Sequence, residues 1–149
     1  MHDSAKRSLR LLPVLVALTL TVGACSGSTS TDSSLTSPSA TLVTESFSGS
    51  ITQNGTAIHP FAVKTTGNSL LVGFTSVSPS SLTALGMGIG TWDGTTCGLN
   101  LSQNDSAKVG NTGLSGTAQL GNYCIRVYDG GNITDSTITA TYTLQVQHY

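Results

Sequence analysis

Charged side chains are scarce in this chain: they make up 9% of its 149 residues, against about 25% in an average soluble domain. Beyond residue 24 there are three basic residues, Lys64, Lys108 and Arg126, and six acidic ones, so the formal charge of that part is −3. A nucleic-acid-binding surface needs clustered Lys and Arg to neutralise phosphates. The composition therefore excludes nucleic acid as a partner and predicts a surface covered by Ser, Thr, Asn and Gln.

Long apolar runs are also lacking. The apolar segment near the N-terminus, Leu11 to Val22, has 12 residues and contains Pro13, whereas a helix that spans the hydrocarbon layer needs about 20. Basic residues precede this segment, at Lys6, Arg7 and Arg10, and small residues follow it. That order is typical of a secretory signal. The alternatives are an ordinary cleaved signal without lipidation and an uncleaved membrane anchor, which the short length disfavours.

The end of this segment, Val22-Gly23-Ala24-Cys25, resembles the lipobox of bacterial lipoproteins. The resemblance implies a signal peptide over residues 1–24 and a diacylglyceryl group on the thiol of Cys25. Such a chain is held in the cell envelope by its lipid, durably so because more than one acyl chain is attached. Ser26 stands where an Asp often marks retention in the inner membrane. The resemblance thus implies the outer membrane if the cell has one, and otherwise the outer face of the cytoplasmic membrane.

Cysteine is rare, and its count of three is odd, which in an exported protein calls for a free thiol or an intermolecular bond. Lipidation of Cys25 leaves Cys97 and Cys124, and exported compartments allow these two to pair. A catalytic or metal-binding thiol pair is the alternative, but it would need a neighbouring His or a CxxC spacing, and neither is present. We therefore predict a disulfide between Cys97 and Cys124.

Residues 25–44 hold the lipidated cysteine and a Ser/Thr-rich stretch that predicts a flexible tether. Residues 45–149 are then one domain of a common size for a single core. Its apolar residues alternate with polar ones, most clearly at Ile138, Ala140, Tyr142, Leu144 and Val146, as half-buried antiparallel strands require. Further strands are predicted at 47–51, 58–64, 70–75, 85–91, 98–101, 114–120 and 123–128, with turn signals between them. The pattern indicates an all-β sandwich or barrel.

Two segments near the C-terminus, Gly121 to Asp129 and Tyr142 to Val146, resemble the last two strands of bacterial pre-peptidase C-terminal domains. Phe61-Ala62-Val63, Gly67 and the run from Leu70 to Thr75 resemble an earlier strand pair of that family. The resemblance covers residues 45–147 and implies an antiparallel, jelly-roll-like β-sandwich with a capacity for binding. It carries over no catalytic residue. His59-Pro60 replaces the acidic residue usual before the early Phe, and no peptidase domain shares the chain.

Catalytic chemistry finds little support in the sequence. His59 and His148, the two histidines beyond residue 24, lie in no recognisable motif and are interpreted as surface or strand-end residues. A zinc site needs three or four protein ligands, and the chain has too few His and Cys residues to provide them. Asp129, Asn132 and Asp135 are weak calcium candidates, since calcium wants six to eight oxygens and a Gly-rich stretch of this kind is ordinary turn chemistry. We expect no enzyme activity and no cofactor.

Binding has better candidates. Trp92 and Tyr128 are the aromatic residues proposed to contact a ligand, a glycan above all, although packing of Trp92 against the Cys97–Cys124 bridge competes with that interpretation. Glycines at 86, 88 and 90 leave one face of a strand without side chains, which indicates close packing or, alternatively, a ligand groove. The sequence predicts a non-catalytic envelope lipoprotein that binds an envelope or extracellular protein or glycan. A structural spacer or subunit of a surface assembly is the alternative, and a hydrolase a distant one.

Overall fold

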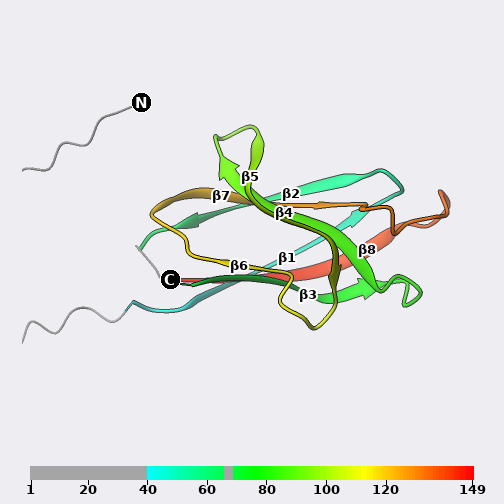
Figure 1. The fold of residues 1–149 in the computed structure, drawn as a ribbon, viewed down its shortest axis with the longest axis horizontal. Helices are drawn as coiled ribbons and strands as arrows, with labels where there is room; N and C mark the ends of the chain where they lie inside the picture. Colours follow the sequence, from blue (N-terminus) through cyan, green and yellow to red (C-terminus); the bar gives the residue numbers. More distant parts are fainter. Residues whose placement is uncertain (1–39, 66–68) are drawn as a thin grey trace, which may run out of the picture. The chain divides into compact units, whose positions relative to one another are not determined.

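The structure, a computed structural model, describes residues 40–65 and 69–149. The predicted signal peptide, Cys25 and the tether up to residue 39 lie outside the described residues and stay predictions. In the described part no helix is long and apolar enough to cross a membrane. That part holds eight strands (Figure 1): β1 (Val43–Ile51), β2 (Thr56–Val63), β3 (Leu70–Ser78), β4 (Ala84–Trp92), β5 (Cys97–Lys108), β6 (Leu114–Gly116), β7 (Gly121–Tyr128) and β8 (Ala140–His148).

The strands form two four-stranded sheets, with the orders β1-β8-β3-β6 (sheet A) and β2-β7-β4-β5 (sheet B), and every pair is antiparallel. Consecutive strands up to β4, and again from β5 to β8, lie in opposite sheets, while the β4–β5 hairpin stays within sheet B. This is the strand order of an eight-stranded jelly roll. The predicted all-β, jelly-roll-like sandwich is confirmed, and its first strand begins two residues before the predicted domain start.

The core lies between the two sheets because each strand turns alternate side chains inward. Phe74 and Leu144 of sheet A and Ile125 and Val127 of sheet B are at most 2% exposed. In β8 the alternation runs from Ala140 through the last residue of the strand, with buried residues at every second position. One apolar layer thus holds both sheets together.

Strand β5 departs from the prediction, which gave it four residues instead of twelve. Its pairing with β4 has two register shifts, one between Leu85 and Met87 and one between Ile89 and Thr91. At the second, Gly98 pairs with Thr91 and Ser102 pairs with Ile89, so residues 99–101 all lie opposite Gly90. A bulge of this kind breaks the period-two signal that sequence reasoning depends on. Strand β6 is shorter than predicted, with three residues, because only Leu70 to Val72 of β3 pair with it.

Candidate functional site

The glycine-lined face of β4 is closed by packing. A Cβ on Gly86 would meet the ring of Tyr128, and one on Gly88 would lie 3.1 Å from the methyl groups of Leu99. At Gly90 the obstacle is the backbone of β5 itself, since a Cβ there would lie 2.9 Å from the Cα of Leu99 and closer still to the Gly98 carbonyl. The packing interpretation of the three glycines is therefore right, and these positions offer no groove.

The predicted disulfide between Cys97 and Cys124 is confirmed. It joins β5 to β7, two strands that are separated in sheet B by β4. Strands two places apart in a flat sheet are about 9.6 Å apart, but the Cα atoms of the two cysteines are 5.8 Å apart. The start of β5 must therefore fold over β4, and it does so at Gly90, which pairs with Cys124.

The two aromatic ligand candidates lie far from one another. Tyr128 pairs with Gly86 near one end of β4, while Trp92 pairs with Cys97 at the other. Six residues of strand separate the two positions along β4, which is about 20 Å. Strand β4 ends at Trp92. Figure 1 shows that the turn between β4 and β5 projects from the sandwich. The two half-buried rings therefore do not form one platform for a sugar.

Tyr128 is also committed to the fold. Its hydroxyl donates a hydrogen bond to Asp105, and the guanidinium of Arg126 lies 5.6 Å from its ring centroid. Burial, together with the hydrogen bond to Asp105 and its charge, raises the pKa of Tyr128 to about 12. The ring covers Gly86 and so seals the outer face of β4.

The weak calcium candidates form turns. One oxygen of Asp129 accepts hydrogen bonds from the backbone N–H groups of Gly131, Asn132 and Ile133, and the other accepts one from Asn54. Burial acts to raise the pKa of Asp129, but these four bonds outweigh it and hold the pKa low. Asp135 accepts from Thr137. Within residues 40–65 and 69–149, no three His, Cys, Asp or Glu side chains are grouped so that they could hold a metal ion.

Both histidines face the interior between the sheets, which corrects the surface interpretation, although His148 does lie at a strand end as the last residue of β8. His148 is 3% exposed, and its Nε2 lies 3.0 Å from Oε1 of Glu45. His59 is half-buried, with its Nε2 2.7 Å from the Tyr142 hydroxyl and its ring 5.3 Å from that of Phe47. One histidine thus meets a carboxylate and the other a hydroxyl, which is not the arrangement of a Ser-His-Asp triad. The sequence did carry a signal for His148, since it continues the alternation of β8.

We expect the free energy of unfolding to fall below about pH 6.5, the ordinary pKa of histidine, because burial lowers the pKa of His59 in the folded state. Below that pH the unfolded chain binds more protons at this position than the folded one, so acid favours unfolding. A His59→Gln variant keeps a polar group for Tyr142 but does not titrate. Urea unfolding between pH 5 and 8 should therefore show that the free energy of unfolding falls less on acidification in the variant than in the wild type. An equal fall in both proteins would contradict a lowered pKa of His59 in the folded state.

An apolar pocket opens at the edge of the sandwich where β5 faces β6. It has a volume of about 190 Å³. Its buried walls come from both sheets, with Leu70 and Leu114 from sheet A and Ile89 from sheet B, while Leu101 is 53% exposed. Leu101 belongs to the β5 bulge, so the bulge shapes the entrance. We call this cavity the edge pocket; no sequence pattern predicted it.

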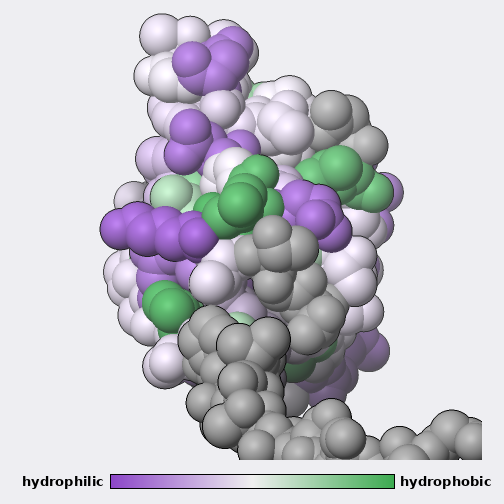
Figure 2. Space-filling model, turned by 90° about the vertical axis from the view of Figure 1, so that its left-hand side faces the viewer, coloured by the Kyte–Doolittle hydropathy of each residue, from purple (hydrophilic) through white to green (hydrophobic). Residues whose placement is uncertain are grey.

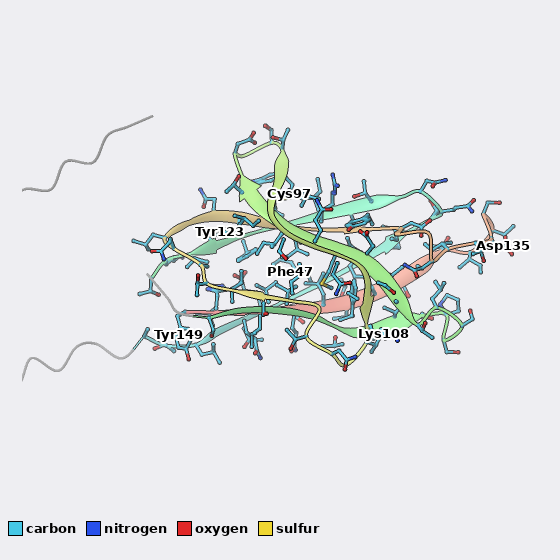
Figure 3. All side chains as sticks on the ribbon, in the orientation of Figure 1. Phe47, Cys97, Lys108, Tyr123, Asp135 and Tyr149 are labelled. Carbon is cyan, nitrogen blue, oxygen red and sulfur yellow. A yellow bond between two sulfur atoms is a disulfide. The ribbon has the colours of Figure 1, made fainter. Side chains whose placement is uncertain are left out.

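The surface at one end of the domain shows how its apolar residues are distributed. Figure 2 shows the end of the domain that bears the C-terminus, where apolar residues occur as separate spots among neutral and hydrophilic ones. Figure 3 shows side chains from both sheets meeting in the layer between them, around the labelled Phe47.

No protein-family model matches the sequence, and no curated protein matches it either. Among solved structures, the periplasmic inhibitor of g-type lysozyme from Aeromonas hydrophila (PliG) is similar at 20% identity and a TM-score of 0.49, over 71% of this chain and 86% of that one. A similarity at this level carries no information on function.

Proposed function

We propose that this chain is a non-catalytic, lipid-anchored protein of the cell envelope whose sandwich binds another protein through the edge pocket. The anchor is the diacylglyceryl group predicted on Cys25. The binding element is the pocket between β5 and β6, which accepts one apolar side chain of the partner. The proposal includes that the domain is related to pre-peptidase C-terminal domains, and such a relation agrees with a binding role.

The size and lining of the edge pocket support this proposal more than any other observation. Sites for small molecules commonly enclose about 300–1,000 Å³, and the edge pocket is smaller, at about 190 Å³. It matches a single leucine or aromatic side chain. Aromatic anchor residues that fill such pockets are typical hot spots of protein–protein interfaces.

A protein partner is favoured over a glycan. Sugar recognition by this chain was expected to use Trp92 and Tyr128, but these lie at opposite ends of β4 and Tyr128 is engaged by Asp105. Five of the ten residues that line the edge pocket are aliphatic, and these suit an apolar residue better than a hydroxylated ring.

Substitution at the pocket entrance tests the proposal. A Leu101→Lys variant places a charge at the entrance on a residue that is 53% exposed, so the fold should tolerate it. Leu71→Lys is the matched control, because Leu71 is 37% exposed and lies outside the edge pocket. We expect proteins that cross-link to the wild type in the envelope to be captured at least about tenfold less by Leu101→Lys, since a charge in an apolar contact is costly to desolvate. Equal capture by both variants would refute the edge pocket as the binding site.

A further inference from the structure

Each sheet of the sandwich leaves two strands at its edges: β1 and β6 in sheet A, and β2 and β5 in sheet B. A free edge presents unpaired backbone groups to other chains, and proteins protect it with short strands, proline, charges or bulges. Three of the four edges are short, contain proline or are bulged. β6 has three residues, β2 contains Pro60, and β5 has two register shifts together with Asp105 and Lys108.

Strand β1 is the least protected of the four edges. Its nine residues pair with β8 in one unbroken register, from Val43 with His148 to Ile51 with Ala140. It contains no proline, and its one protective feature is the inward-pointing charge of Glu45, which lies 3.0 Å from His148 of β8. Among the described residues, no backbone hydrogen bond outside the β8 pairing reaches β1. Its outer-face side chains are exposed and small: Thr44, Ser46, Ser48 and Ser50.

We propose that β1 is a self-association edge, at which β1 of a second copy of this chain adds antiparallel and extends sheet A across two molecules. Only one register pairs all nine residues of both strands. In it, Phe47 lies opposite Phe47 of the second copy. It follows from the bounds of β1, and it keeps each residue on the same face as its partner, as a pleated sheet requires.

The side chains suit this register. On the outer face Thr44 meets Ser50 and Ser46 meets Ser48, and pairs of hydroxyl residues stabilise neighbouring strands. On the inner face Glu45 lies opposite Gly49, so no like charges oppose one another. Val43, which is 41% exposed in the single chain, lies opposite Ile51, which is 3% exposed and already packed in the core.

Self-association at β1 is independent of the edge pocket and goes beyond the proposed function. In sheet A, β1 and β6 are opposite edges, so a β1–β1 dimer leaves both edge pockets free. Two pockets on one assembly would give bivalent binding, which strengthens attachment without any new contact.

Cysteine trapping tests the register. Two tagged forms of the full chain, one with Thr44→Cys and one with Ser50→Cys, are produced together in a bacterial envelope and run on a non-reducing gel. Opposed residues of antiparallel strands have Cα atoms about 4.5–5.5 Å apart, within the range a disulfide bridges. We expect a mixed dimer, and at least about fivefold less from either form alone or from the Ser76→Cys control paired with Ser50→Cys.

Charges at the other outer-face pair decide whether a trapped dimer reflects this interface. S46K/S48K in both chains puts like charges opposite one another and should reduce the trapped dimer at least about tenfold. S46K/S48E in both chains puts opposite charges there and should restore it. Absence of a mixed dimer in the wild-type background, or a dimer equally strong in all charge backgrounds, would overturn the proposal. Neither result depends on Leu101, so the proposed function is tested separately.

Discussion

A Gly90→Ala variant is expected to lose about 3 kcal/mol or more of unfolding free energy, at the upper end of the range for overpacked sites. The added Cβ would press against the carbonyl of Gly98 and lie 2.9 Å from the Cα of Leu99. Both obstacles are backbone atoms of β5, and the Cys97–Cys124 bridge holds that part of β5 over β4. No side-chain rotation can relieve the contact, so the whole β5 crossing would have to move.

Gly88→Ala is the matched control, two residues away on the same face of β4. There the new Cβ would lie 3.1 Å from the methyl groups of Leu99, a side chain that can change rotamer. We expect a loss below about 1.5 kcal/mol, as for mild changes in packing. Urea unfolding of the purified variants measures both values. Similar losses at Gly88 and Gly90 would mean that β5 does not cross β4 as closely as described.

Much of the fold could be predicted from the sequence because the strands of this sandwich are half-buried, and half-burial produces alternation. Strand β8 is the clearest case: its apolar positions from Ala140 to Val146 are the buried ones, and the same alternation would have placed His148 inside. The three glycines of β4 also carried a readable signal, since missing side chains imply a close neighbour. What they could not tell was whether that neighbour is Tyr128, a side chain of β5 or its backbone.

The edge pocket could not have been predicted in the same way. Its walls come from five strands, and residues such as Leu70, Ile89 and Leu114 look like ordinary core positions in the sequence. The pocket exists because β5 bulges at 99–101 and β6 is too short to close the edge beside it. Both features are set by contacts between distant segments. The separation of the two aromatic candidates could not be predicted for a related reason. The register of β4 with its two neighbouring strands decides how far apart Trp92 and Tyr128 lie.

Removal of the disulfide is the second large effect. Cys97→Ala/Cys124→Ala should lower the free energy of unfolding by about 3.5 kcal/mol, because the bridge closes a loop with a sequence separation of 27 and so reduces the entropy of the unfolded chain. For a domain of this size the melting temperature should fall by roughly 15 °C or more. Reduction of the wild-type bridge is the control, since it opens the same loop without deleting a side chain.

Comparison of the two routes separates two contributions of the bridge. Cys124 is fully buried in sheet B, so the alanine variant also leaves a small cavity, whereas the reduced wild type keeps both sulfur atoms. If loop closure dominates, the reduced protein and the alanine variant should melt within a few degrees of one another, both well below the oxidised protein. A reduced protein that melts as high as the oxidised form would contradict the loop-closure account. It would mean that packing of β5 over Gly90, rather than the covalent link, stabilises the crossing.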